Sequence, residues 1–271
     1  MWYSSKEFCL FYFKIETFLH LYSYVIVTSE GGCTMSLIDV AIQSAGYEQK
    51  KEIIKDIDFS IEKGELVGLI GPNGAGKSTT IKSLLGLIEH IEGKVSYIEG
   101  INYSYLPERP IFYDELTLWE HLDFVAAVEG LDEIQYKQKA NELLNQYKLW
   151  DYAHENPAKY SKGMQQKAML ILAMITNPLL YIIDEPFMGL DPNAMKLFLE
   201  SIEKERNRGA GILMSTHVLD TAEKICDRFL IIHKGHLVAK GTLEDIRGQC
   251  QLPDGSLYDC FHLLAEDNES E

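Results

Sequence analysis

Basic residues are scarce in this sequence. Its 271 residues include 25 Lys and Arg against 41 Asp and Glu, which gives a formal net charge of −16. Nucleic-acid-binding proteins present a basic surface, and anionic lipid attracts basic segments. We therefore expect no nucleic acid as a partner. If the chain works at a membrane, another protein has to hold it there.

Cysteine is also scarce, and it follows no pattern. The five cysteines are scattered, and none has the spacing of a metal-binding motif, which argues against a zinc site and against a disulfide scaffold. We expect reduced thiols, as in the cytosol, at Cys9, Cys33, Cys226, Cys250 and Cys260.

A clean membrane-spanning run is missing as well. The aromatic and aliphatic stretch 8–27 is interrupted by a lysine, a glutamate and a histidine, whereas a spanning helix needs about 20 mostly apolar residues. We interpret residues 1–34 as an N-terminal extension. The preferred hypothesis is that translation starts at Met35, because codons for residues 30–32 would be purine-rich, like a bacterial ribosome-binding site. A disordered or anchoring extension is the alternative.

What the sequence does contain is a glycine-rich phosphate-binding pattern. Residues 71–78 fit G-x-x-x-x-G-K-[ST], between a strand predicted over 66–70 and a helix predicted over 79–88. The glycines let backbone N–H groups converge on phosphate oxygens, and the helix N-terminus adds a positive dipole. Lys77 would reach the β- and γ-phosphates, and Ser78 would hold Mg²⁺. The nucleotide-binding residues expected here are Gly71, Pro72, Asn73, Gly74, Ala75, Gly76, Lys77, Ser78 and Thr79.

Two carboxylates follow a second apolar strand, which is predicted over 179–183. Because ligands of parallel α/β sheets bind at the carboxyl ends of the strands, Asp184 and Glu185 should face the nucleotide. Asp184 would orient Mg²⁺, and Glu185 would act as the general base on the attacking water. His217 follows another apolar strand, over 211–214, and would sense the γ-phosphate.

A second anion-binding element opens the helix predicted over 164–176. Ser161 and Gly163 stand at its N-terminus, where a free hydroxyl and backbone N–H groups favour phosphate. Since one chain needs only one phosphate-binding loop, this element is expected to serve the nucleotide of a second copy.

Together these motifs resemble the ATP-binding subunits of ABC transporters, over about residues 36–248. By this resemblance Tyr47 stacks on adenine, Asp191 belongs to the D-loop and Met164 completes the signature motif. The resemblance implies the cofactors ATP and Mg²⁺. The catalytic residues are then Lys77, Glu185 and His217, and the metal ligands are Ser78, Glu108 and Asp184. Beyond the phosphate-binding loop, the expected nucleotide-binding residues are Tyr47, Ser161, Gly163, Met164 and Asp191.

The resemblance also implies a fold and an assembly. The α/β fold is a RecA-like P-loop NTPase core with a small antiparallel β-subdomain and an α-helical subdomain inserted over about 108–177. The ATP-binding domain covers 35–250, and the acidic tail 251–271 is expected to be only partly ordered. ATP hydrolysis would take place at two composite sites of a head-to-tail dimer. The dimer would dock on a separate integral-membrane permease at the cytoplasmic face of the plasma membrane.

Within the family the chain most resembles the Ecs-type bacterial exporters, in residues 105–108, 113–118, 161–164 and 181–187. Ecs-type systems are linked to protein secretion and peptide handling, so export is expected. Three features depart from the family pattern. The signature reads Tyr-Ser-Lys-Gly-Met at 160–164, Glu108 replaces the Q-loop glutamine, and a short segment between Gly93 and Tyr105 predicts a trimmed β-subdomain.

Two other functions use the same phosphate-binding loop. A soluble ABC ATPase without a permease, acting as a scaffold, remains an alternative. A P-loop kinase is disfavoured, because it would lack the signature stretch and His217. The permease is expected to dock around residues 110–119, with core packing as the alternative for each of Ile111, Phe112, Tyr113, Leu116, Leu118 and Trp119.

Overall fold

The structure, a computed structural model, describes residues 36–48 and 51–267. The hypotheses about residues 1–34 and a start at Met35 lie outside these residues. One nine-stranded sheet organises the described chain, in the order β4-β1-β2-β9-β8-β3-β7-β6-β5. Its strands are β1 (Ser36–Gly46), β2 (Ile54–Glu62), β3 (Leu66–Ile70), β4 (His90–Tyr97), β5 (Tyr103–Leu106), β6 (Leu180–Asp184), β7 (Gly211–Thr216), β8 (Arg228–His233) and β9 (His236–Gly241).

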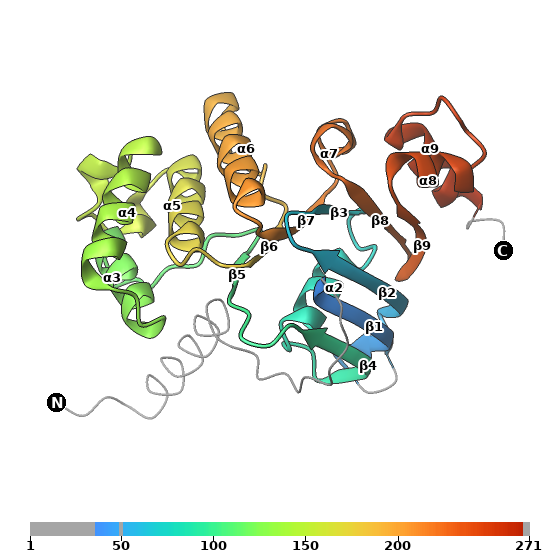
Figure 1. Cartoon of the computed structure of the whole chain (residues 1–271), viewed down its shortest axis with the longest axis horizontal. Helices are drawn as coiled ribbons and strands as arrows, with labels where there is room; N and C mark the ends of the chain where they lie inside the picture. The colour runs from blue at the N-terminus through green and yellow to red at the C-terminus, as the bar shows by residue number, and fades with distance from the viewer. Residues whose placement is uncertain (1–35, 49–50, 268–271) are drawn as a thin grey trace.

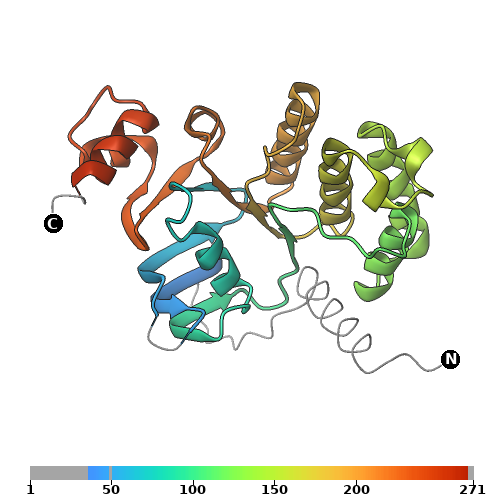
Figure 2. The same cartoon turned by 180° about the vertical axis from the view of Figure 1, so that it is seen from behind.

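Strands β5, β6, β7, β3 and β8 are parallel neighbours. In β3, β6 and β7 every residue is buried, as expected for parallel strands covered on both faces. The helix α2 (Lys77–Leu84) lies on one side of these strands, and α6 (Pro192–Asn207) and α7 (Leu219–Ile225) lie on the other (Figures 1 and 2). This part is the expected RecA-like core.

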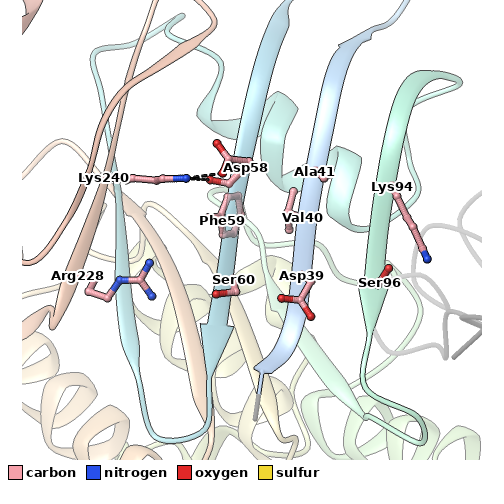
Figure 3. Close-up of a pocket in the computed structure, with 10 residues that line it drawn as sticks. All are labelled: Asp39, Val40, Ala41, Asp58, Phe59, Ser60, Lys94, Ser96, Arg228 and Lys240. Carbon is pink, nitrogen blue, oxygen red and sulfur yellow. Dashed lines mark hydrogen bonds and ion pairs between the residues drawn. The ribbon is translucent and has the colours of Figure 1, made fainter. Parts of the chain in front are cut away.

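Strands β4, β1 and β2 form the antiparallel end of the sheet. Alternate residues of β1 are buried against the core, and the others face outward. Figure 3 shows this outer face, a shallow depression lined by small and charged side chains such as Asp39, Ala41 and Ser60. It corresponds to the expected β-subdomain. β4 pairs with β1 from Ile38 to Gly46, so the short segment after Gly93 does not remove this pairing.

A helical group stands at one end of the molecule (Figure 1). It contains α3 (Leu118–Val128), α4 (Glu133–Gln146) and α5 (Lys162–Met174), with short 3-10 turns at Trp150–Tyr152 and Pro157–Lys159. Thr117 caps α3 in a capping box with Glu120, which fixes where that helix begins. The group occupies the region expected for the helical subdomain.

The C-terminal tail, predicted to be only partly ordered, contains regular structure at residues 257–267. They form helix α9 (Leu257–Asp267), which packs with α8 (Leu243–Gln249) and α7. Leu257 and Cys260 are fully buried in an apolar cluster with Ile246. Sequence reasoning missed this helix because the chain ends in acidic residues, although apolar residues recur at helical spacing before them. None of the helices in the described chain is long and apolar enough to cross a membrane.

Candidate nucleotide-binding site

The predicted site residues lie at the ends of three neighbouring strands. β7 lies between β3 and β6, with Ile70 opposite Thr216 and Asp184 opposite Ser215. The phosphate-binding loop after β3, the carboxylates ending β6 and His217 after β7 therefore meet at one edge of the sheet, as the sequence predicted.

The phosphate-binding loop needs its glycines for two different reasons. A Cβ on Gly71 would lie 2.4 Å from the carbonyl oxygen of Ile232, and Gly76 has a left-handed φ of 113°. The hairpin between β8 and β9 supports the loop from behind, because the Gly235 N–H donates to the Ala75 carbonyl at 2.9 Å. Residues 72–74 are exposed, so the rim of the loop is open to a ligand.

The three predicted catalytic residues are in contact. Glu185 is buried, and its Oε1 lies 3.2 Å from Lys77 Nζ, while its Oε2 lies 2.8 Å from Nδ1 of His217. Lys77 also donates to the carbonyl oxygen of Gly71 at 2.8 Å. A lysine and an imidazole thus flank the carboxylate at the mouth of the loop. This is the arrangement required of a base that activates water beside a phosphate.

Ser78 and Asp184, two of the three predicted metal ligands, are also together. The Ser78 hydroxyl donates to Asp184 Oδ2 at 3.0 Å. One hydroxyl and one carboxylate suit Mg²⁺, which prefers oxygen ligands and keeps waters and substrate phosphates around it. No group of three or more His, Cys, Asp or Glu that could hold a metal occurs in the described part of the chain. Ser78 and Asp184 would hold Mg²⁺ through their oxygen atoms, and the ion would neutralise phosphate charge.

Glu108, the third predicted ligand, is exposed just beyond the end of β5. Burial, followed by the charges of Asp184 and Glu108, raises the pKa of Tyr105 far above its ordinary value. Asp184 ends β6 and Glu108 follows its parallel neighbour β5, so both residues lie at the same edge of the sheet. The role of Glu108 as a metal ligand stays a prediction.

Tyr47, the predicted adenine partner, is 46% exposed. The Lys82 ammonium, on α2, lies 5.4 Å from the centre of the Tyr47 ring. The ring is thus held beside the helix that begins at the phosphate-binding loop. Sequence reasoning missed Lys82, and no local sequence signal pairs it with Tyr47.

The signature residues lie at the exposed N-terminus of α5. Ser161 caps that helix by accepting the Met164 N–H at 3.3 Å, and Gly163 lies against the carbonyl oxygen of Gly189. Asp191 caps α6 and lies 3.5 Å from Lys167 of α5. Hydrogen bonds donated by backbone N–H groups, above all that of Ala194, hold the pKa of the Asp191 carboxyl group below its usual value. These contacts join the signature to the D-loop within one chain.

Ser215 is a site residue whose role sequence reasoning missed. The strand is predicted only over 211–214, yet Ser215 is a fully buried member of β7 and contacts both Asp184 and Glu185. The available signal was a serine at the end of an otherwise apolar strand.

Comparison with known proteins agrees with this geometry. The family model of ABC transporters matches residues 54–188. The chain is 50% identical over 231 residues to the uncharacterized ABC transporter ATP-binding protein YthP of Bacillus subtilis (strain 168), covering 85% of this chain and 98% of that protein. It is 40% identical over 244 residues to the ABC-type transporter ATP-binding protein EcsA of the same organism, covering 86% and 98%.

Solved structures agree as well. A structure described as the ATP-binding subunit of an ABC transporter matches with a TM-score of 0.80 and 43% identity, covering 84% of this chain and 99% of that one. A nucleotide-free ATP-binding cassette, at 21% identity and a TM-score of 0.64, covers 80% and 96% and shares the fold. The predicted P-loop NTPase fold is confirmed. The chain belongs to the ATP-binding subunits of ABC transporters, and it is an ATPase.

Proposed function

We propose that this ATPase hydrolyses Mg²⁺-bound ATP at a site shared between two copies, and that it powers a separate membrane permease for export. The observation that carries the proposal is the contact of Glu185 with Lys77 and His217, beside the Ser78–Asp184 pair. Lys77 binds phosphate, Glu185 takes a proton from water, and His217 holds the Glu185 carboxylate toward the γ-phosphate.

The composite site is supported by where Ser161 lies. Ser161 and Lys162 are exposed at the N-terminus of α5, and the Ser161 hydroxyl, which accepts the Met164 N–H, can still donate its own proton outward. In the proposed dimer this end of one copy covers the nucleotide held by Lys77 of the other. The subunits are then arranged head to tail, and each nucleotide contacts both.

The permease is proposed to dock on the helical group, near the segment 110–119. Within that segment Tyr113 and Leu118 are buried, so they belong to the core, the alternative that the sequence left open. Ile111 is 38% exposed and remains available.

Aromatic side chains continue this surface. Trp150 is 45% exposed and meets Trp119 edge-on, with ring centres 6.1 Å apart. Tyr152, in the same 3-10 turn, is also exposed. Exposed aromatic residues of this kind are favoured at protein interfaces. Cysteine cross-linking from Ile111 or Phe112 to the co-expressed permease tests the docking site, with exposed Ile134 of α4 as the control position.

Export is proposed from the Ecs-like features and from the likeness to EcsA. In this assembly the chain is held at the cytoplasmic face of the plasma membrane by its permease. The alternative is an ABC ATPase that works as a scaffold without a permease. Affinity purification of the full chain from detergent-solubilised membranes tests the choice. A multi-span membrane protein that co-purifies supports the transporter, and purification without one supports the scaffold.

A further inference from the structure

A buried serine hydroxyl holds the two carboxylate residues at the end of β6. Ser215 is fully buried, and a buried hydroxyl without a partner costs roughly 1–3 kcal/mol. Ser215 lies directly opposite Asp184 in the parallel pairing of β6 and β7. Its bonds go to Asp184 and to Glu185, which immediately follows β6.

The first bond fixes the Asp184 carboxylate. The Ser215 hydroxyl donates to Oδ1 of Asp184, while Ser78 donates to Oδ2 at 3.0 Å. Each carboxylate oxygen thus has its own hydroxyl donor, one from β7 and one from the phosphate-binding loop. Two donors on opposite oxygens set the plane of the carboxylate, which a single donor would leave free to rotate.

The second set of bonds fixes the Glu185 backbone. The Glu185 N–H donates to the Ser215 hydroxyl at 3.1 Å and to the Ser215 carbonyl oxygen at 3.2 Å. Glu185 has a φ of 50°, a left-handed conformation that costs a residue other than glycine about 1–3 kcal/mol. The side chain that leaves this bend reaches Lys77 and His217. The bond to Ser215 therefore holds a strained backbone at the residue that has to face water.

We propose that Ser215 is a positioning residue for hydrolysis of Mg²⁺-bound ATP. It sets the orientation of Asp184 toward the metal and keeps Glu185 in the conformation that faces the γ-phosphate. Serine suits this position because its hydroxyl donates to a carboxylate and accepts an N–H at the same time. The inference rests on the proposed function, since it takes Asp184 as the carboxylate on the metal side and Glu185 as the base.

The test compares Ser215→Ala with Ser104→Ala. Ser104 is a matched control, because it is also buried in the sheet, on β5, and its hydroxyl has no hydrogen-bond partner in the described part of the chain. Each substitution is placed in a Glu185→Gln protein, which blocks turnover. ATP binding is then measured by titration calorimetry with Mg²⁺ and with EDTA. Binding of Mn²⁺ in the presence of ATP is followed by electron paramagnetic resonance.

Loss of a residue that hydrogen-bonds a metal ligand typically lowers metal affinity or activity 10–100-fold. We expect Ser215→Ala to leave ATP affinity in EDTA within two-fold and to weaken Mn²⁺ binding about 10-fold, while Ser104→Ala changes neither. With Glu185 restored, Ser215→Ala should lower kcat about 10–100-fold and change KM less than three-fold. Metal binding and kcat equal to those of Ser104→Ala would overturn the inference. A loss of ATP affinity in EDTA as large as the loss with Mg²⁺ would also overturn it, because that result indicates general damage to the fold.

The same experiment separates this inference from the proposed function. If Glu185→Gln alone retains turnover, the assigned base is wrong, and the role of Ser215 fails with it. If Glu185→Gln abolishes turnover while Ser215→Ala behaves as the control does, the proposed function stands and only the role of Ser215 is overturned.

Discussion

Lys77 and Glu185 form a buried ion pair, with Lys77 Nζ 3.2 Å from Glu185 Oε1. The lysine that should bind phosphate is therefore paired with the proposed base. A phosphate entering the loop has to compete with Glu185 for this lysine. ATP binding would thereby change the surroundings of the Glu185 carboxylate.

This pairing predicts a coupled effect on stability. Lys77→Ala should leave Glu185 buried without its cation and destabilise the protein by about 3–5 kcal/mol. Adding Glu185→Gln removes the uncompensated charge, so the double variant should be more stable than Lys77→Ala alone. Urea unfolding of the parent chain, the two single variants and the double variant measures the coupling free energy between Lys77 and Glu185. Strictly additive effects would show that the two residues do not interact.

Tyr47 is predicted to contact the base of the nucleotide and not its phosphates. Tyr47→Ala should weaken ATP binding about 5–150-fold, since stacking on a base is worth roughly 1–3 kcal/mol. Tyr47→Phe should bind like the parent chain, because it keeps the ring beneath Lys82. Titration with inorganic triphosphate, which has no base, is the control. An equal loss of triphosphate affinity in Tyr47→Ala would contradict stacking.

The C-terminal helix should contribute to stability through its buried face. Leu257→Ala is expected to cost about 2–4 kcal/mol, because Leu257 is fully buried between α9 and its neighbours. Tyr258 is the matched control, since it follows directly and is 52% exposed. Tyr258→Ala should change the free energy of unfolding by less than about 0.5 kcal/mol. Equal effects of the two substitutions would mean that α9 does not pack as described.

Glu129 predicts a pH dependence of stability. Burial raises the pKa of this carboxyl group, at the C-terminal end of α3, to about 7. The folded protein therefore holds a proton that the unfolded chain releases near pH 4.5, and stability falls as the pH rises from about 4.5 through 7. Glu129→Gln should be about 1–2 kcal/mol more stable than the parent at pH 8, after allowance for its partial exposure. Chemical unfolding from pH 8 to 5 should show the gap shrinking, and a constant gap would contradict the assignment.

The sequence predicted most of the core because its strands are short, apolar and bounded by turns. The strand predicted over 66–70 coincides with β3, and the one predicted over 179–183 differs from β6 by one residue at each end. The helix after the phosphate-binding loop begins two residues earlier than predicted, at Lys77, because the left-handed Gly76 precedes it. Helix α9 was missed, since its buried face is set by packing against α7 and α8 rather than by composition.

Part of the site could also be predicted from the sequence. The meeting of Lys77, Glu185 and His217 follows from parallel strands that end at one edge, which a sequence pattern can reveal. The contact of Ser215 with Asp184 depends on the register of β6 against β7, which no local pattern encodes. The proposed partner of Ser161 is the nucleotide of a second copy, so it lies beyond what the sequence and fold of one chain describe.

The central claim is that two copies share each nucleotide, and trapping the dimer with ATP tests it most directly. Glu185→Gln keeps the shape of the side chain and removes the base, whose contribution to rate is about 10²–10⁴-fold. Turnover should nearly vanish while ATP still binds, so that each γ-phosphate stays clamped between Lys77 of one copy and Ser161 of the other.

Light scattering of Glu185→Gln with Mg²⁺ and ATP, alone and with the permease, is the measurement. The account predicts a dimer that forms with ATP, is absent with ADP, and is lost when Ser161→Arg is added, because a bulky cation would fill the end of α5. A Glu185→Gln protein that binds ATP yet stays monomeric in both settings would contradict the shared site and indicate a self-contained P-loop enzyme.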